Sequence, residues 1–460
     1  MVVRLMESLA TTPKMAALFS DESVLAAMLA FEAGLARAQA SLGIIPSTAV
    51  APIEDAARAE LYNAGEIAAA SVHSGTATIP LVKALRERVG KVSPLAAGFV
   101  HWGATSQDVA DTAIILLLKQ ARSILQADLA RLESALYRVS EQHAHTVMLS
   151  RTLLQAAVPT TLGLKVAGWL GALCRDHGRL DDAFEQALIL QFGGAGGTLA
   201  SLGDHGIAVG QALARELSLA YPDAPWHTHR DRLAALMCAL GVMVGSLGKM
   251  ARDVSLLMQN EVAELAEPAA KGRGGSSAMP HKQNPVGCTM TLAAAYRVPG
   301  LVSMFLSSMV QEHERAAGGW QSEWATICSI VQETGLAVAS MAEVAEGITV
   351  DTARMRANLE AAHGTIFAER ATMLLSGKLG RELTSSLIER AVAESVATGR
   401  NFVDVLAGMQ EVREALDAAT LGDLQSPESY LGAAEEFRCR LAQSQKQRES
   451  GSDHRKGRET

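Results

Sequence analysis

The chain has 460 residues, of which 48% are hydrophobic and 4% are aromatic. This length can bury a core large enough for two or three domains, and the hydrophobic content excludes a chain that is disordered throughout. The formal net charge is −8, with 41 basic residues interspersed among 49 acidic ones. The basic residues form no continuous stripe in the sequence, so we do not expect a nucleic-acid partner.

Neither a secreted protein nor a membrane protein is indicated. The five cysteines are scattered and lack C-x-x-C spacing, so we expect neither a disulfide framework nor a structural zinc site. The N-terminus lacks the pattern of a signal peptide. The longest uncharged stretch, Leu233 to Gly248, is shorter than the about 20 residues that a membrane span needs. We therefore expect a soluble, cytoplasmic protein.

The first predicted element is a helix that Ser20 can cap and that ends near Gly43. Short helical segments follow, so residues 1–108 are predicted to form an N-terminal helical domain. Five long segments, almost free of proline and apolar on one side, come next: 109–143, 159–190, 228–265, 286–312 and 324–346. In the third, an apolar residue recurs every seven positions, at Leu233, Leu240, Leu247 and Val254. That spacing is typical of the seam of a helical bundle.

These segments predict a central bundle over residues 109–350 and a smaller helical domain over 351–441. The polar, charged end of the chain, 442–460, is predicted to be disordered. No alternating β-run of useful length stands out, so the predicted fold is all-α, with a long bundle between two smaller helical domains. Helices this long exceed what one chain easily covers, which predicts surface buried between subunits.

A glycine-rich loop precedes the fourth long segment and reads GGSSAMPHKQNP, residues 274–285. Glycine lets the backbone approach a ligand and move. Ser276, Lys282 and Asn284 add a hydroxyl, a cation and an amide. These donors suit a carboxylate substrate, because a buried anion is costly without them. Glycine content alone would indicate only a flexible loop.

A second polar segment, HWGATSQD, ends at Asp108. Thr105 or Ser106 can cap the helix that follows, and a helix N-terminus with free N–H groups readily binds a carboxylate. Simple capping explains the same residues. In isolation, His101 is explained by a structural role.

A third polar segment, SRTLLQ, begins at Ser150. Thr152 and Gln155 lie three positions apart and would share one face of a helix. The alternative is a polar face near a helix start.

The string GSSAMPHKQNP resembles the signature of the fumarase/aspartase superfamily, whose members are all-α tetramers that add or eliminate groups beside a carboxylate. The resemblance runs from about Phe19 to Leu441. It implies that Ser276 is the catalytic base on a mobile loop and that Lys282 and Asn284 contact a substrate carboxylate. The pattern H-x-G-x-T-S-x-D is the first conserved region of this superfamily, which implies a substrate-binding role for its Thr and Ser, here Thr105 and Ser106.

The second conserved region of the superfamily is usually written T-H-x-Q, and its Thr and Gln match Thr152 and Gln155. The position of its histidine is Leu153 in this chain. In adenylosuccinate lyase, argininosuccinate lyase and the fumarases that histidine has acid or substrate-binding roles, which leucine cannot fill. The departure indicates a branch of the superfamily that works without it.

Bacterial 3-carboxy-cis,cis-muconate cycloisomerases are the branch that the chain resembles. Further strings carry this resemblance: LQFGGAGGTL from residue 190, PWHTHRDR from residue 225, and QEHER from residue 311, followed by Trp320 and Glu323-Trp324. The resemblance implies formation of a γ-lactone from 3-carboxymuconate, in the protocatechuate branch of the β-ketoadipate pathway, with proton transfer through Ser276. It implies no metal and no cofactor, and a homotetramer whose active sites are shared between subunits, without a nucleic-acid or membrane partner.

Other residues are candidates for contacts with the carboxylates of such a substrate. Three arginines are possible partners: Arg151, Arg230 and Arg315. Four residues are further candidates by their position near the motifs: His101, Ser277, His281 and His313.

Three alternatives stay open. A 3-sulfomuconate cycloisomerase would use the same donors, because sulfonate and carboxylate are both oxyanions. A lyase of the adenylosuccinate type would release fumarate, which Leu153 argues against. An inactive structural paralogue would not need Ser276, Lys282 and Asn284, so their presence argues against it.

Overall fold

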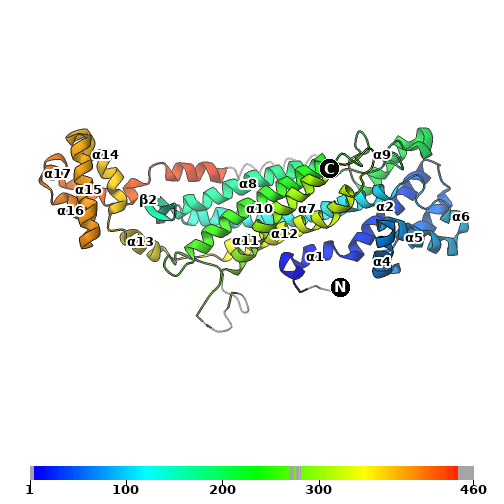
Figure 1. The fold of residues 1–460 in the computed structure, drawn as a ribbon, viewed down its shortest axis with the longest axis horizontal. Helices are drawn as coiled ribbons and strands as arrows, with labels where there is room; N and C mark the ends of the chain where they lie inside the picture. Colours follow the sequence, from blue (N-terminus) through cyan, green and yellow to red (C-terminus); the bar gives the residue numbers. More distant parts are fainter. Residues whose placement is uncertain (1–4, 269–273, 276–278, 280, 444–460) are drawn as a thin grey trace. The chain divides into compact units, whose positions relative to one another are not determined.

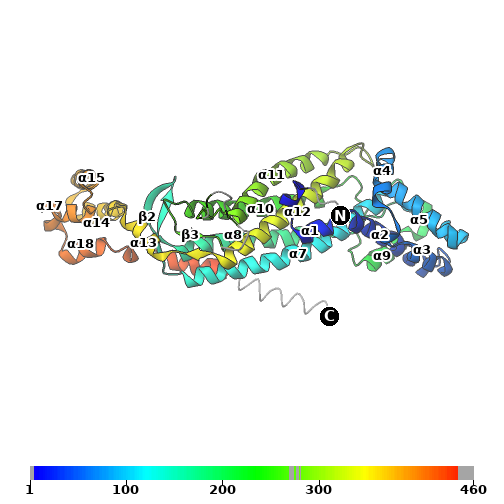
Figure 2. The same cartoon turned by 90° about the horizontal axis from the view of Figure 1, so that it is seen from below.

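The computed structural model describes residues 5–268, 274–275, 279 and 281–443. This part of the chain is mainly helical, with only a few short strands (Figures 1 and 2), which confirms the all-α prediction. The longest helices include α7 (Ser106–Gln142), α8 (Leu162–Ala187), α10 (Asp231–Leu257), α11 (Val286–Ser308) and α12 (Gly319–Gly347). They match the predicted long segments, with ends displaced by several residues.

The chain divides into two compact units, and each of these five helices contributes residues to both. Unit 1 is made of Met1–Ala130, Asp176–Gly248 and Thr289–Ser340, and unit 2 is made of Arg131–Arg175, Lys249–Cys288 and Met341–Thr460. The division into consecutive domains at residues 108, 350 and 441 stays a prediction.

The shorter helices of unit 1 lie mainly near its N-terminus. They are α1 (Pro13–Leu18), α2 (Asp21–Ser41), α3 (Val50–Ala56), α4 (Ala64–Ser74), α5 (Thr78–Val92), α6 (Pro94–Ala97) and α9 (Gly206–Leu217). As predicted, the Ser20 hydroxyl caps α2 by accepting the backbone N–H of Ser23 at 3.3 Å. Helix α2 packs against α9, where Gly34 meets Leu213 and Leu217.

The predicted heptad series forms the buried side of α10. Leu233, Leu240, Leu247 and Val254 are all at most 2% exposed, which confirms that they face the core. Within unit 1, α10 also comes close to α11. A Cβ atom at Gly248 would lie 2.6 Å from Cβ of Ala295, so this position requires glycine for the two helices to approach.

A β-hairpin in unit 2 was not predicted. Strand β1 (Val147–Thr152) pairs antiparallel with β2 (Gln155–Thr161), and Thr152 lies opposite Gln155. The placement of Thr152 and Gln155 on one helical face was therefore wrong. The turn between them consists of Leu153 and Leu154 with φ values of 50° and 66°, where asparagine and glycine are the usual residues. The sequence therefore carried no turn signal.

The C-terminal helices of unit 2 enclose an apolar core. These are α13 (Thr352–Glu360), α14 (Ala368–Leu379), α15 (Arg381–Thr398), α16 (Phe402–Ala407), α17 (Gln410–Ala415) and α18 (Ala418–Leu424), and a short strand β4 (Thr349–Val350) pairs with β3 (Leu265–Ala266). Leu375, Leu387 and Phe402 are fully buried in this core. Residues 442 and 443, the first two of the tail predicted to be disordered, are helical, and the rest of that tail, from 444 onwards, lies outside the described residues.

Within the described residues, three helices, α10, α11 and α12, are long and apolar enough to cross a membrane by length and composition alone. More than half of the most apolar window is buried inside the protein in α10 and α12, at 56% and 61%, whereas the figure for α11 is 22%. The apolar character of α10 and α12 is thus explained by core packing, whereas most of the apolar window of α11 is not buried by the described residues.

Candidate active site

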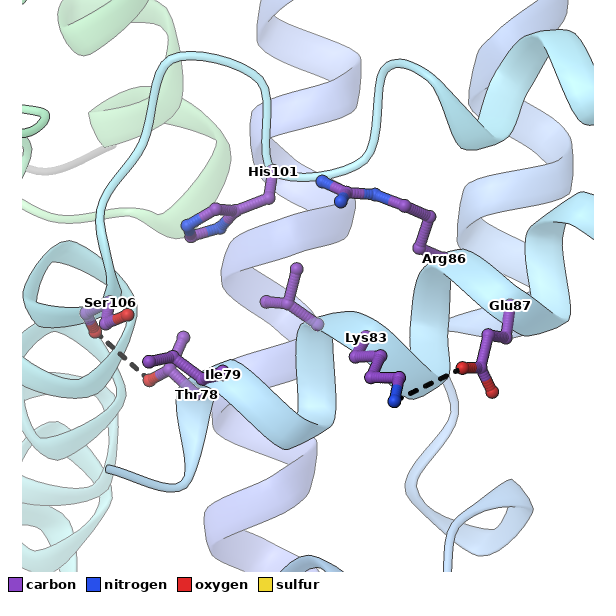
Figure 3. A pocket seen from close by; sticks show the side chains of 8 residues that line it. Thr78, Ile79, Lys83, Arg86, Glu87, His101 and Ser106 are labelled. Atoms are coloured by element: carbon purple, nitrogen blue, oxygen red, sulfur yellow. Dashed lines mark hydrogen bonds and ion pairs between the residues drawn. The ribbon is translucent and has the colours of Figure 1, made fainter. Parts of the chain in front are cut away.

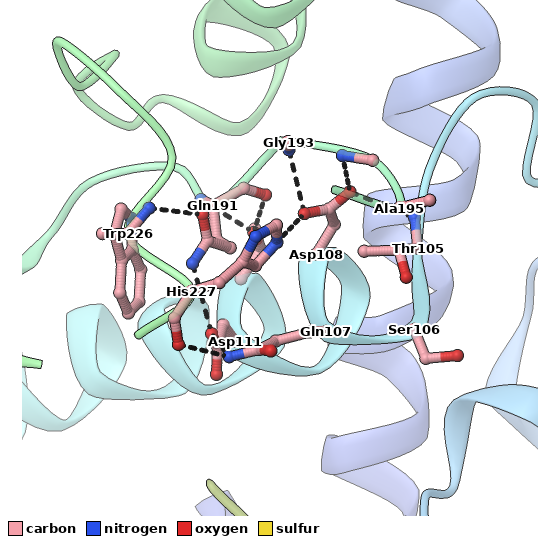
Figure 4. A network of polar contacts seen from close by, with 12 residues as sticks. Thr105, Ser106, Gln107, Asp108, Asp111, Gln191, Gly193, Ala195, Trp226 and His227 are labelled. Atoms are coloured by element: carbon pink, nitrogen blue, oxygen red, sulfur yellow. Dashed lines mark hydrogen bonds and ion pairs between the residues drawn. The ribbon is translucent and has the colours of Figure 1, made fainter. Parts of the chain in front are cut away.

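The first turn of α7 is organised by the buried carboxylate of Asp108 (Figure 4). One oxygen accepts the backbone N–H groups of Thr105 at 3.0 Å and Gly194 at 2.9 Å. The other accepts the N–H of Gly193 at 3.0 Å and lies 2.7 Å from Nε2 of His227. Through one side chain, Asp108 therefore fixes three segments: the start of α7, the loop that contains Gly193 and Gly194, and the segment before α10 that contains His227.

Close packing at Gly193 brings the loop to this carboxylate. A Cβ atom at Gly193 would lie 2.7 Å from Cβ of Pro225 and 2.8 Å from Cε1 of His227. Real side chains do not tolerate such distances, so any larger residue would push His227 away from Asp108. Gly193 is therefore needed for the geometry of the network and not only for flexibility.

Arg230 lies in a second, deeper network. Its guanidinium donates to Asp111 at 2.8 and 3.1 Å and to Glu323 at 2.6, 3.0 and 3.1 Å. The side chains of Arg230, Asp111 and Glu323 are at most 3% exposed. Burial would lower the pKa of Arg230, but the two carboxylates raise it. Burial raises the pKa of Glu323, against the effect of Arg230.

The guanidinium of Arg230 therefore already donates to two carboxylates of the protein itself. Trp320 also donates to Asp111, at 2.9 Å. A contact between Arg230 and a substrate carboxylate stays a prediction, and the geometry gives it no support.

Arg315 and Thr105 are brought together at the start of α7. The Arg315 guanidinium donates to Oγ1 of Thr105 at 3.2 Å and to the carbonyl oxygens of Gly194 and Ala195 at 3.2 and 3.0 Å. These acceptors are all neutral, and among the described residues no carboxylate pairs with Arg315. A bound carboxylate would be a stronger acceptor than any of them.

Three further candidates lie in unit 1. Ser106 lines a pocket together with His101, and its carbonyl accepts the hydroxyl of Thr78 at 3.1 Å (Figure 3). His313 is exposed, and its carbonyl accepts the hydroxyl of Thr228 at 3.0 Å. The structure therefore gathers Thr105, Ser106, His101 and Arg315 around the first turn of α7, and shows no function for the His313 ring.

The candidate residues of the β1–β2 hairpin, which are Arg151, Thr152 and Gln155, lie in unit 2. Arg151 makes a two-pronged ion pair with the buried Glu264, at 2.7 and 3.0 Å. Asn358 donates to the same carboxylate at 2.8 Å. Thr152 and Gln155 are exposed beside the turn. The charge of Arg151 is thus matched within the chain, whereas the polar groups at the hairpin tip are accessible.

The glycine-rich loop of residues 274–285, which carries the superfamily signature, lies only partly within the described residues. The N–H of Asn284 donates to the carbonyl of Gly274 at 2.8 Å, and Gly275 bridges to Gln283, so the two ends of the loop meet. Lys282 and His281 are exposed. Ser276 and Ser277 lie outside the described residues, and their roles stay predictions.

The central residues of the networks, Asp108, Asp111, His227 and Glu323, were not predicted as site residues. Asp108 and Asp111 lie three apart on α7, a spacing that places both on one face of a helix. Uncommonly polar strings in an otherwise apolar chain, which contain His227, Arg230 and Glu323, were visible in the sequence. The sequence could not predict which of these distant charged residues pair with one another, because no local sequence pattern determines such a pairing.

Comparison with known proteins agrees with this architecture. The family model described as "Lyase" matches residues 6–300, and that described as "Adenylosuccinate lyase C-terminus" matches residues 364–441. A 3-carboxy-cis,cis-muconate cycloisomerase from Bradyrhizobium diazoefficiens is 46% identical over 96% of this chain and 98% of its own.

Two more relatives span a similar share of the chain. The crystal structure of 3-carboxy-cis,cis-muconate lactonizing enzyme from Pseudomonas putida superposes with a TM-score of 0.92 and 43% identity, over 97% of this chain and 99% of that one. A nitrosuccinate lyase from Streptomyces davaonensis is 41% identical over 92% of this chain and 91% of its own. The similarity thus extends over nearly the whole length of proteins that are named for two different reactions, a cycloisomerisation and a lyase reaction.

Proposed function

Because this chain belongs to the fumarase/aspartase superfamily of lyases, we propose that it is a cycloisomerase that converts 3-carboxy-cis,cis-muconate into a γ-carboxymuconolactone. The observation that carries the proposal is the similarity to cycloisomerases of that name over nearly the full length of both chains. Leu153, at the position of the superfamily's T-H-x-Q histidine, supports it, because a lyase that needs an imidazole there would be impaired.

The reaction needs one proton donor and a strong anion-binding site. An oxygen of one substrate carboxylate forms a bond to a carbon of a C=C double bond. The electron pair of that double bond moves to the carbon beside another carboxylate, which gives an aci-carboxylate dianion. A proton from Ser276 then completes the lactone. Donors fixed in advance stabilise such developing charge most effectively, and Lys282, Asn284 and Gln155 are the proposed donors of unit 2.

In unit 1 the corresponding donors are Thr105 and Arg315. The guanidinium of Arg315 rests on neutral oxygens beside the Thr105 hydroxyl, so a substrate carboxylate can replace these acceptors without breaking an ion pair. Asp108 fixes the backbone on which both contacts depend. We therefore assign Arg315 and Thr105 to one carboxylate of the substrate, and Asp108 to positioning them.

We further propose a cytoplasmic homotetramer with active sites shared between subunits. Supporting this, Tyr296 and Leu306 of α11 are 71% and 43% exposed, although this helix is apolar enough to be buried. Large apolar side chains exposed on such a helix support a surface that another protein covers. Replacing Leu306 with aspartate is expected to give smaller species in size-exclusion chromatography with light scattering, and a wild-type monomer would contradict the proposal.

The test of the function is direct. The purified protein is mixed with 3-carboxy-cis,cis-muconate, and loss of the ultraviolet absorbance of the conjugated diene reports lactone formation. Ser276→Ala is expected to abolish turnover and to leave the fold intact by circular dichroism. Parallel assays for fumarate from adenylosuccinate and from nitrosuccinate, and for turnover of 3-sulfomuconate, separate the alternatives. Unchanged absorbance with active wild-type controls would refute the cycloisomerase assignment.

A further inference from the structure

A pocket of about 510 Å³ opens beside the first turn of α7 (Figure 3). Its lining includes the basic residues Lys83, Arg86 and His101 and the hydroxyl of Ser106, and Glu87 is the one acid among its eight lining residues. Arg86 donates to the carbonyl of Val100 at 3.2 Å and pairs with no carboxylate among the described residues, whereas Lys83 lies 4.0 Å from Glu87. The pocket is therefore suited to an anion.

His101 has an unusual backbone and a buried partner. Its φ is 62°, a left-handed conformation that a non-glycine residue adopts at a cost and often at functional sites. Its Nδ1 lies 2.6 Å from Oε1 of Glu32 on α2, and the Glu32 side chain is 1% exposed. The other ring nitrogen, Nε2, has no partner among the described residues.

The charge state of His101 is set by its surroundings. Burial lowers its pKa, but Glu32 raises it by charge and by hydrogen bonding, and Asp108 adds to this, so that the pKa lies above the ordinary 6.5 in spite of Arg86. The charged groups facing the ring are Glu32 on α2, Asp108 on α7 and Arg86 on α5. The ring thus keeps its second proton to higher pH than a free imidazole does, and in the imidazolium form both nitrogens are donors.

We propose that Glu32 holds His101 as an imidazolium whose Nε2–H donates to a carboxylate bound in this pocket, with Lys83 and Arg86 adding charge at its rim (Figure 3). Glu32 is then a positioning residue that acts through His101. That the carboxylate is one of the three of the substrate rests on the proposed function. The anion-binding pocket itself does not.

Two isosteric variants separate this proposal from a general electrostatic effect. Glu32→Gln and Glu87→Gln each remove one negative charge from the surroundings of the pocket. If only the overall charge mattered, both would strengthen the binding of an anion. Under the proposal, Glu32→Gln weakens it, because His101 loses the group that keeps it protonated and oriented, whereas Glu87→Gln strengthens it.

The binding probe is propane-1,2,3-tricarboxylate, compared by calorimetry with pentanedioate, which has the same skeleton without the middle carboxylate. Between about pH 6.5 and 8.5, where carboxylates are ionised, wild-type binding of the tricarboxylate is expected to weaken as pH rises through the pKa of His101. In Glu32→Gln this loss moves to lower pH, and affinity near neutral pH falls about tenfold, as for the loss of a charged hydrogen bond.

His101→Asn is the second variant, because asparagine tolerates positive φ and removes the imidazole. It is expected to bind the tricarboxylate weakly and without this pH dependence. Equal or tighter binding by Glu32→Gln, an unchanged pH profile in His101→Asn, or no binding by the wild type would each overturn the proposal. Turnover of 3-carboxymuconate, measured on the same preparations, tests the proposed function separately.

Discussion

Replacing Arg230 by methionine tests whether the buried network of unit 1 is an obligatory ion cluster. Methionine keeps much of the length of arginine and removes the charge, so Asp111 and Glu323 would be left buried without their cation. Removing one partner of a buried pair costs about 3–5 kcal/mol. Since two carboxylates lose the same partner, we expect a loss in the free energy of unfolding of at least about 3 kcal/mol.

A matched control is available on α13. Arg356 also pairs with two carboxylates, Glu360 and Glu428, but all three side chains are about half exposed, between 46% and 63%. Arg356→Met is expected to cost less than about 1 kcal/mol. Urea unfolding followed by circular dichroism at one protein concentration compares the two variants. A loss in Arg230→Met no larger than in Arg356→Met would refute the reasoning.

Three further predictions concern single positions. Because the pKa of Glu323 is raised, the folded state keeps this proton at pH values above 4.5 at which the unfolded chain has lost it, so the stability of the wild type falls as pH rises through this window. Glutamine does not titrate, so the melting temperature of Glu323→Gln should rise relative to that of the wild type as pH increases. A difference in melting temperature that stays constant with pH would contradict this. Leu154 has a φ of 66°, so Leu154→Gly should stabilise the protein by roughly 1 kcal/mol. Leu154→Val, which introduces a β-branched side chain, should destabilise it, and thermal unfolding measures both changes. Gly193→Ala should lower both the melting temperature and turnover through the clash with Pro225 and His227, whereas Gly196→Ala, with nothing within 4 Å, should be neutral.

The long helices could be predicted from sequence because they carry their own signal. The seven-residue apolar series of α10 repeats over several turns, and each member is buried. The cap at Ser20 depends only on residues within one turn of the helix. The ends were less certain, since the polar residues at the end of a helix can also belong to the loop that follows.

The site was predictable only where a motif resembled a known family. Thr105, Ser106 and Lys282 came from such strings. By contrast, Gly193, Gly194 and His227, which contact the Asp108 carboxylate, are 85 to 119 residues away from it in the chain. Glu32 gave no signal at all, because it lies among the alanines of a helix. A carboxylate becomes a positioning group only through the fold that places a histidine 2.6 Å from it.

The hairpin shows why the failure of a local rule is itself informative. Its two-residue turn uses leucines at φ values of 50° and 66°, and they are 96% and 74% exposed. Glycine or asparagine would make this turn with less strain, and a polar residue would suit water better. Under the proposed role of Gln155 as a substrate donor, the strained, exposed leucines beside it are a cost in stability that the chemistry of the tip would explain. The same position is where the superfamily's histidine is missing, so the substitution of Leu153 by histidine, tested for fumarate release and for lactonisation, would show whether the apolar tip selects the reaction.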